Sequence, residues 1–256
     1  MKKTFIIISV SDRVNELNHL IETINAQGFD DYDINLLYQD YIGNKDKIKY
    51  KDRYKNIFVY NEKLGCHGAR VQLLKDLDIE KYDIFINLDD DMELIPETNY
   101  DNAVKKCLEK GTGFVLTNWA RTKELAEKKK ARIRNEFIKQ VFVYQGGGMV
   151  YSKKIARLMK DLQVCHAEFD DIWPLTAYIN GYNNYRDMSS LAIHHVCVRG
   201  GMRSYMREKI RPLLCKEYVN YRFGKNGIEA LIPQDSDLNE KAKLLHRMNK
   251  KDEAIL

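Results

Sequence analysis

The stretch Ile84-Phe85-Ile86-Asn87-Leu88-Asp89-Asp90-Asp91 indicates the fold of this chain, because an apolar run ends in three consecutive carboxylates. A short apolar run of this kind is typical of a strand that is buried on both faces of a parallel sheet. Adjacent carboxylates repel one another at neutral pH, so three of them where a buried strand leaves the core favour oxygen ligation of a hard divalent cation. Mg²⁺ or Mn²⁺ bound in this way keeps coordination positions open for phosphates. We therefore predict a metal site and a substrate that carries a diphosphate.

A second interpretation of the acidic triplet needs no metal. Three acidic residues can form a solvated turn that caps a following helix, since carboxylates favour helix N-termini. The segment from Glu97 to Lys110 suggests such a helix. The remaining segments of the chain help to decide between the two interpretations.

Alternating strands and helices in residues 1–110 predict a doubly wound α/β sheet. The first strand is the apolar run from Lys3 to Val10. Further strands are expected at residues 33–38, 56–60 and 82–88, and helices at residues 14–28 and 65–77. In open α/β sheets, ligands bind beyond the carboxyl ends of the strands. Asp12, Asp40 and the acidic triplet all follow such ends, so three separate loops should converge on one site.

Beyond Gly111 the predicted pattern becomes mixed. We expect strands at residues 113–118, 141–144 and 190–193, a charged helix that extends to about Lys139, a helix at residues 152–162, and another that ends at Gly181-Tyr182. The last forty residues are polar and are expected to be helical or loose. No second folded domain is evident, and a chain of 256 residues suits one large α/β domain.

The chain has features of a soluble, intracellular protein. No stretch approaches the ~18 apolar residues of a membrane span, and Met1-Lys2-Lys3 leads straight into the first strand without the apolar region of a signal peptide. Its five cysteines are widely spaced and include no C-x-x-C pair, which argues against a disulfide framework or a zinc knuckle. We expect reduced thiols and a location in the cytoplasm of a bacterium or of a virus-infected host cell.

Charge is unevenly distributed along the chain. Residues 1–110 hold 16 Lys+Arg against 21 Asp+Glu, a net charge of −5, whereas residues 111–256 hold 26 against 16, a net charge of +10. The positive charge concentrates in residues 121–139 and 199–222. Such patches attract phosphate-rich partners, whether a nucleotide, an anionic lipid or a nucleic acid. A solvated helix face is the alternative explanation for the first cluster.

Taken together, these segments resemble the GT-A glycosyltransferases, in particular the large inverting family 2 group. The resemblance runs from Lys3 to about Arg203. It rests on the order and spacing of six parts: the first strand ending at Ser9, the helix start Gly68-Ala69-Arg70, the Asp-x-Asp motif at Asp89 and Asp91, the glycine-rich loop, the pair Asp170-Asp171, and the late histidines. The resemblance implies a GT-A domain over residues 1–205 with a mostly parallel central sheet flanked by helices. Residues 1–110 would bind the nucleotide sugar, residues 111–205 would bind the acceptor and carry out catalysis, and residues 206–256 would form a basic helical extension.

The same resemblance implies a metal site and a catalytic base. Asp91 and Asp89 would hold Mn²⁺ or Mg²⁺ on the diphosphate of the donor, with His194 or His195 as a further ligand. The base would be a carboxylate in the acidic segment before a helix. Asp171 fits best, with Asp170 and Glu168 close behind, and a helix-capping role is the alternative for this pair. A base on one face of the sugar and a leaving group on the other imply inversion at the anomeric carbon.

Donor and acceptor residues are implied by matching positions in the family. The donor set is Ser9, Asp12, Asp40, Gly68, Arg70, Asp89, Asp90, Arg199 and Arg203, the last two closing over the diphosphate. The acceptor set is Gly146, Gly147, Gly148 and Trp173. Where the family has an Asp-Asp-Gly-Ser type signature, this chain has Leu37-Tyr38-Gln39-Asp40-Tyr41. This departure weakens the assignment of the donor nucleoside, for which the resemblance favours uridine.

The resemblance leaves the acceptor open. The positive charge of residues 111–256 favours a hydroxymethylated pyrimidine in viral DNA, and a bacterial surface glycan or lipid-linked saccharide is the alternative. Two other classes of function compete. A nucleotidyltransferase should have a glycine-rich loop after the first strand, and residues 9–13 contain no glycine. A non-catalytic nucleic-acid-binding protein would explain the basic half of the chain but not the carboxylates at three strand ends. The sequence does not indicate an oligomeric state.

Overall fold

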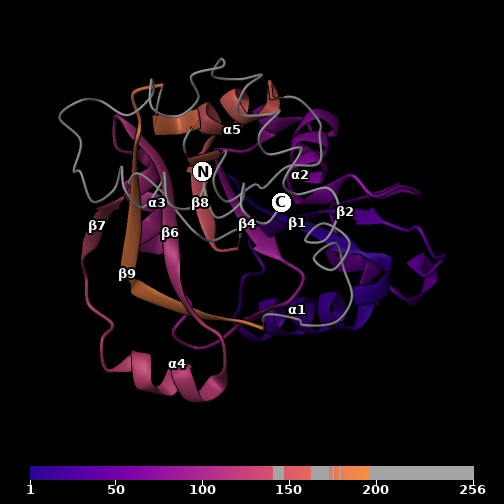
Figure 1. Cartoon of the computed structure of the whole chain (residues 1–256), viewed down its shortest axis with the longest axis horizontal. Coiled ribbons are helices and arrows are strands. Elements are labelled where there is room, and N and C mark those ends of the chain that lie inside the picture. Colours follow the sequence, from indigo (N-terminus) through magenta and orange to yellow (C-terminus); the bar gives the residue numbers. More distant parts are fainter. Residues whose placement is uncertain (141–146, 163–172, 175, 179, 196–256) are drawn as a thin grey trace, which may run out of the picture.

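The structure of the chain, a computed structural model, describes residues 1–140, 147–162, 173–174, 176–178 and 180–195. These residues form one nine-stranded sheet that is flanked by helices (Figure 1). The strands are β1 (Lys3–Val10), β2 (Tyr32–Gln39), β3 (Asn56–Tyr60), β4 (Ile84–Asp89), β5 (Met92–Leu94), β6 (Thr112–Ala120), β7 (Phe137–Gln140), β8 (Met149–Ser152) and β9 (Asn183–His194). The helices are α1 (Val14–Ala26), α2 (Gly65–Asp76), α3 (Asp101–Leu108), α4 (Lys123–Lys130) and α5 (Lys153–Lys160).

The sheet has the strand order β3-β2-β1-β4-β8-β6-β9-β5, and β7 pairs with β9 beside this path. The strands β3, β2, β1 and β4 are parallel, and β9 runs parallel to β6. The strand β8 is antiparallel to both β4 and β6, and β5 and β7 are antiparallel to β9. Most strands therefore point one way, and only β5, β7 and β8 among the described strands oppose them. The predicted α/β fold with a mostly parallel central sheet flanked by helices is confirmed.

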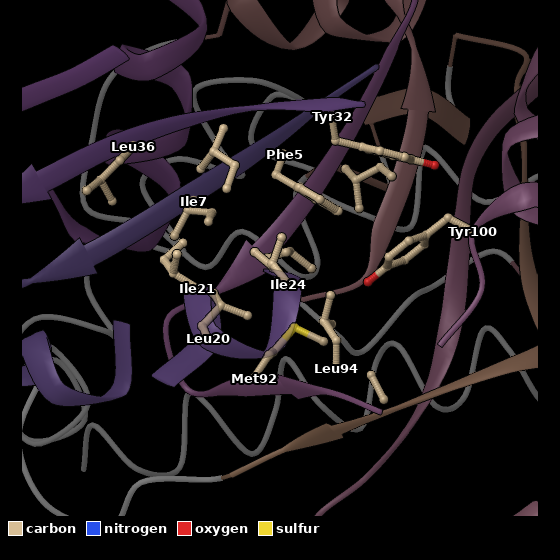
Figure 2. Close-up of a cluster of buried hydrophobic side chains, with 14 of the residues drawn as sticks. Phe5, Ile7, Leu20, Ile21, Ile24, Tyr32, Leu36, Met92, Leu94 and Tyr100 are labelled. Carbon is tan, nitrogen blue, oxygen red and sulfur yellow. The ribbon is translucent and has the colours of Figure 1, made fainter. Parts of the chain in front are cut away.

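The core lies in two layers, one on each face of the sheet. Because side chains alternate along a strand, Phe5 and Ile7 of β1 pack in one layer with α1 and α3, whereas Ile6 and Ile8 pack in the other with α2 and α5. Figure 2 shows the first layer, in which Phe5 and Ile7 lie against the apolar face of α1 with Met92 and Leu94 of β5. The continuous apolar run of β1 is thus explained by burial on both faces.

The long charged helix predicted to reach Lys139 is not what forms. The helix α4 ends at Lys130, and β7 follows at Phe137–Gln140. The segment just before β7 is hydrogen-bonded to β9. The Arg134 N–H donates to the Met188 carbonyl at 3.1 Å, and the Met188 N–H donates to the Glu136 carbonyl at 2.9 Å. Phe137 and Ile138 are residue types that favour strands, and the edge of β9 is available for pairing. Pairing with the edge of β9 therefore overrides the local helical pattern.

Three other segments differ from the prediction. The glycine-rich segment continues into a strand, β8, which lies between β4 and β6. The strand β9 has 12 residues where four were predicted, and it bends sharply along its length (Figure 1). The short strand β5, which follows the acidic triplet directly, was not predicted at all. All three depend on partners that are distant in the sequence, and a local pattern does not reveal these.

Some predictions fall on residues that the structure does not describe. These are the strand at 141–144, most of the helix before Gly181, and the C-terminal extension at 206–256. Among the helices of the described residues, none is long and apolar enough to cross a membrane.

Candidate active site

The acidic triplet lies at the switch point of the sheet. The chain moves outward from β1 to β2 and β3, and then returns to the other side of β1 to form β4. The carboxyl ends of β1 and β4 therefore diverge at this point, which is where open α/β sheets bind ligands. Asp90 and Asp91 are each only 4% exposed, so the triplet is not a solvated turn. The helix α3 starts at Asp101 and is not capped by these residues.

His194 joins two of the three carboxylates. Its Nε2 lies 2.9 Å from Oδ1 of Asp91 and 3.5 Å from Oδ2 of Asp89. The pairing of β5 with β9 brings this about, since Met92 is in register with His194. One ligand atom from each of Asp89, Asp91 and His194 lies within 4.8 Å of the others. Two carboxylates and one imidazole are a donor set that suits Mn²⁺ or Mg²⁺, and the three residues fit such an ion.

His195 does not join this cluster. Its Nε2 lies 2.8 Å from Oε2 of Glu93, and its backbone N–H donates to the Asp91 carbonyl at 2.8 Å. Of the two histidines that the sequence left as alternatives, His194 is therefore the one beside the carboxylates. Adjacent residues on a strand point in opposite directions, and this explains why only one of the pair reaches the triplet.

Two arginines orient the carboxylates. Arg13 Nη1 lies 3.3 Å from Oδ2 of Asp91, so the oxygen that faces His194 is the other one. In the same way, Arg70 forms an ion pair with Oδ1 of Asp89, and Oδ2 of Asp89 faces His194. Each carboxylate thus has one oxygen held by a guanidinium and one directed at the histidine. Such outer contacts fix the orientation of metal ligands.

Asp90 is not part of the group of Asp89, Asp91 and His194 but contacts residues around it. It accepts a hydrogen bond from Ser9 Oγ at 2.9 Å and pairs with Arg13 at 3.0 Å. Burial raises the pKa of Asp90 well above its usual range, the guanidinium of Arg13 opposes this, and the charge of Asp91 adds to it. The Ser9 hydroxyl is engaged across the switch point, from β1 to the triplet. Arg13 was not among the predicted site residues, although its position directly after Asp12 placed it near the end of the first strand.

Arg70, which the resemblance placed in the donor site, lies in the second turn of α2. It is 2% exposed and also donates to the Cys66 carbonyl at 3.1 Å. Gly68 is buried in the first turn of the same helix. Arg70 thus links the carboxylate of Asp89 to the first turn of α2.

The loops after β1, β2 and β3 meet beside the triplet. Tyr41 O–H donates to Asp12 at 2.7 Å, and Lys63 Nζ lies 4.0 Å from the centre of the Tyr41 ring. Burial and the carboxylate of Asp12 raise the pKa of Tyr41. Asp40 is buried and accepts hydrogen bonds from the backbone N–H groups of Asn44 at 2.6 Å and of the next residue at 3.3 Å. Asp12 and Asp40 were predicted site residues here, whereas Tyr41 and Lys63 were not.

The glycine-rich segment touches the acidic triplet. A Cβ atom at Gly147 would collide with the Met92 side chain and would lie 3.2 Å from Oδ2 of Asp89. Gly148 has a φ of +76°, which favours glycine, and its N–H donates to the Asn87 carbonyl at 2.7 Å. The absence of side chains therefore allows this backbone to approach a candidate metal ligand.

Trp173, which the resemblance placed in the acceptor site, is fully buried. Its ring packs against Phe114 and Tyr151, and its Nε1–H donates to Nδ1 of His67 at 3.2 Å. This position favours a role in the core over direct contact with an acceptor.

A different tryptophan lies next to the metal ligands. The Trp119 ring is edge-on to the His194 ring, with centroids 5.4 Å apart, and the side chain is partly exposed. Arg121 and Lys129 each lie 5.8 Å from the centre of the Trp119 ring. Trp119 was not predicted as a site residue, because only the pairing of β6 with β9 brings it beside His194.

Several predicted site residues lie outside the described residues. These are the candidate bases Asp171, Asp170 and Glu168, the loop residue Gly146, and the arginines Arg199 and Arg203.

Comparison with known proteins supports the fold but identifies no close relative. No family model matches the sequence, and no curated protein matches it. Among solved structures, the chain is similar to the mannosyltransferase PcManGT from Pyrobaculum calidifontis in complex with GDP-Man and Mn²⁺, with a TM-score of 0.56 and 14% identity over 80% of this chain. It is also similar to S. aureus TarS 1-349 in complex with UDP-GlcNAc, with a TM-score of 0.55 and 11% identity over 99% of this chain and 82% of that one. The chain spans 60% of the length of PcManGT. At such identities the likeness establishes the fold alone.

Proposed function

We propose that this chain, which has the GT-A fold that its sequence predicted, is a metal-dependent inverting glycosyltransferase that moves a sugar from a nucleotide-diphosphate sugar to a hydroxyl acceptor. The observation that carries the proposal is the cluster of Asp89, Asp91 and His194 at the switch point of the sheet. The similar structures support it, because one contains GDP-Man with Mn²⁺ and the other contains UDP-GlcNAc.

In this proposal Asp89, Asp91 and His194 hold Mn²⁺ or Mg²⁺. When bound, the ion would neutralise negative charge on the diphosphate leaving group. Arg13 and Arg70 keep the ligand oxygens in place by engaging the opposite oxygen of each carboxylate. Because these arginines are buried and already positioned, the site needs little rearrangement to accept an ion.

The nucleoside would bind where the loops after β1, β2 and β3 meet. Tyr41 offers an aromatic ring there, and Asp12 and Asp40 lie beside it. The proposed nucleoside is uridine. Gly68, Ser9 and Asp90 are proposed to lie next to the diphosphate. Arg199 and Arg203 are proposed to close over the phosphates, since guanidinium groups bind phosphate oxygens in pairs.

The proposed catalytic base is Asp171. A sugar hydroxyl is a poor nucleophile near pH 7, so a positioned carboxylate must accept its proton as the oxygen attacks the anomeric carbon. The variant Asp171→Asn should lower turnover by ~10²-fold or more and leave donor binding intact. If it keeps its activity, the same change at Asp170 and Glu168 shows which of them is the base.

For the acceptor, a surface glycan or lipid-linked saccharide is our first choice. The basic face of α4 is largely neutralised, because Lys128 pairs with Glu124 and Lys130 pairs with both Glu97 and Glu127. This weakens the attraction for duplex DNA that the sequence suggested. The partly exposed ring of Trp119 beside His194 is a surface on which an apolar sugar face can pack. A hydroxymethylated base in DNA is the second choice, and salt-insensitive or undetectable binding to duplex DNA would exclude it.

We also propose a cytoplasmic location with reduced thiols. The described part of the chain contains two cysteines, the exposed Cys66 and the buried Cys107. The three remaining cysteines lie outside it.

The experiment that tests the proposed function is a thermal-shift panel of nucleoside diphosphates and nucleotide sugars, with and without Mn²⁺. A ligand that binds only the native state raises its stability by mass action, by about 2.7 kcal/mol at 100 times the dissociation constant. One nucleotide class should stabilise the protein in a manganese-dependent way, and a chelator should remove the effect. If no nucleotide stabilises the protein with or without Mn²⁺, the proposal is wrong.

A further inference from the structure

A second cluster of metal-ligating side chains lies next to the first. It contains His19 of α1, Glu93 of β5, and His195 at the end of β9. Oε2 of Glu93 is its centre, 2.8 Å from Nε2 of His195 and 3.6 Å from Nε2 of His19. One ligand atom from each residue lies within 4.8 Å of the others. Three elements that are far apart in the sequence thus direct nitrogen and oxygen donors at one point.

The spacing of these atoms suits a small tetrahedral ion. Zn²⁺ bonds to imidazole nitrogen and carboxylate oxygen at about 2.0–2.2 Å, so two ligands of a tetrahedron lie ~3.4 Å apart. The distances from Glu93 Oε2 to the two histidines, 2.8 and 3.6 Å, lie on either side of this value. Small movements of partly exposed imidazoles would bring both to it, since the side chains of His19 and His195 are 49% and 40% exposed.

Charged groups lie beside two of these ligands, Glu93 and His19. Lys123 pairs with Oε1 of Glu93 at 2.9 Å, so Oε2 is the oxygen that faces both histidines. The other ring nitrogen of His19, Nδ1, lies 3.8 Å from Oε2 of Glu22, and Glu22 accepts a hydrogen bond from Tyr50 O–H at 2.9 Å. A carboxylate beside the second nitrogen is the usual outer partner of a metal-bound histidine. The Lys123 side chain is 71% exposed and free to move as a cation arrives.

We propose that His19, Glu93 and His195 form a second metal site, which binds a borderline divalent ion such as Zn²⁺ and leaves a fourth position to water. Two imidazoles and one carboxylate favour Zn²⁺, whereas the two carboxylates and one imidazole of the first cluster suit Mn²⁺ or Mg²⁺. The proposal does not depend on the proposed glycosyltransferase activity, because it rests on a separate set of ligands.

The ion would link α1 to the strands β5 and β9, next to which the first cluster lies. Glu93 is two residues after Asp91, and His195 directly follows His194. The His195 N–H also donates to the Asp91 carbonyl at 2.8 Å. A bound ion would therefore fix the ends of β5 and β9, from which Asp91 and His194 reach the active site.

The test measures Zn²⁺ binding in the variant Asp91→Asn, in which the first cluster has lost a ligand. Equilibrium dialysis with metal analysis should find zinc bound, and Zn²⁺ without nucleotide should raise the melting temperature. Adding His19→Ala should weaken zinc binding by at least about 100-fold, since loss of an outer partner alone costs 10–100-fold. Adding Asn15→Ala, an exposed change one turn earlier in α1, should leave zinc affinity unchanged.

Two results would overturn the proposal. One is the absence of zinc binding in Asp91→Asn, and the other is equal zinc affinity in Asp91→Asn with and without His19→Ala. Because His19 lies on the surface of α1, its change to alanine should not affect folding. If Asp91→Asn does not fold, the same comparison is made between the wild-type protein and His19→Ala, and zinc content that is unaltered by His19→Ala would equally refute the site.

Discussion

Nε2 of His194 lies 2.9 Å from Oδ1 of Asp91, and Arg13 holds the other oxygen of that carboxylate at 3.3 Å. The two oxygens of the Asp91 side chain therefore have different partners. Arg13 anchors one oxygen, and the other lies in direct contact with the imidazole, a contact that a cation bound by both side chains would replace. The same division holds for Asp89, which Arg70 anchors.

Replacing Asp91 by asparagine should therefore weaken Mn²⁺ binding at the cluster of Asp89, Asp91 and His194, while the contacts that Arg13 and Arg70 make around it persist. An amide is a weaker ligand for a hard cation than a carboxylate. We expect Asp91→Asn to weaken Mn²⁺ binding by ~10²-fold or more and to abolish the manganese-dependent stabilisation by nucleotide. Calorimetric titration with Mn²⁺ measures the first and a thermal shift the second. Asp78→Asn, an exposed carboxylate change, is the matched control, and unchanged Mn²⁺ affinity in Asp91→Asn would contradict the metal site.

Removing Arg13 should leave a buried charge without its cation. Asp90 is 4% exposed and lies 3.0 Å from the guanidinium, so Arg13→Met should destabilise the fold by about 3 kcal/mol. Adding Asp90→Asn removes one of the two buried charges that Arg13 faces, so part of the loss should be recovered. Urea unfolding of the two single variants and the double variant measures the coupling. Additive effects of the two changes would show that the pair does not interact as the structure indicates.

A methyl group at Gly147 should disturb the metal ligand next to it. Its Cβ would collide with Met92 and would press on Oδ2 of Asp89 from 3.2 Å. We expect Gly147→Ala to cost about 1–3 kcal/mol of stability through overpacking and to weaken Mn²⁺ binding by about tenfold. Unfolding and Mn²⁺ titration on the same protein separate the two effects. Undiminished Mn²⁺ affinity would show that the glycine serves the backbone turn alone.

Asp187 should make stability depend on pH. It closes a bulge in β9 by accepting hydrogen bonds from the Ser189 N–H at 2.8 Å and hydroxyl at 2.6 Å, both on Oδ1. Oδ2 is buried with no hydrogen-bond partner in the described part of the chain. Burial raises the pKa of Asp187. The folded protein therefore holds this proton more tightly than the unfolded chain, and the stability that the proton contributes is lost as pH rises from about 3.9 through the folded-state pKa.

The variant Asp187→Asn carries no charge at any pH and should be more stable than the wild-type protein at pH 8, by about 1 kcal/mol. The difference should shrink as the pH falls toward 4, because the raised pKa of the wild-type carboxyl favours its protonated form. Urea unfolding at both pH values measures the free energies. A difference that is the same at both pH values would show that ionisation of Asp187 is not its cause.

The parallel half of the fold was predictable because its signals are local. The strand β1 is apolar throughout because it is buried on both faces, and α1 presents an apolar residue to the sheet at helical spacing. The acidic triplet was found for the same reason, since it ends a buried strand. The charged segment up to Lys139 was predicted wrongly, because an available edge of β9 turned its last residues into β7.

By itself, the sequence determined the α/β class, the positions of the first four strands along the chain and the place where carboxylates leave the core, since burial and periodicity are properties of neighbouring residues. Only the tertiary structure decided that His194 and not His195 meets the carboxylates, that Arg13 and Arg70 orient them, and that Trp119 lies beside them. These contacts join segments that are far apart in the chain. The pairing of β9 with β5 and β6 sets them, and that pairing depends on the register of strands, which no local pattern encodes.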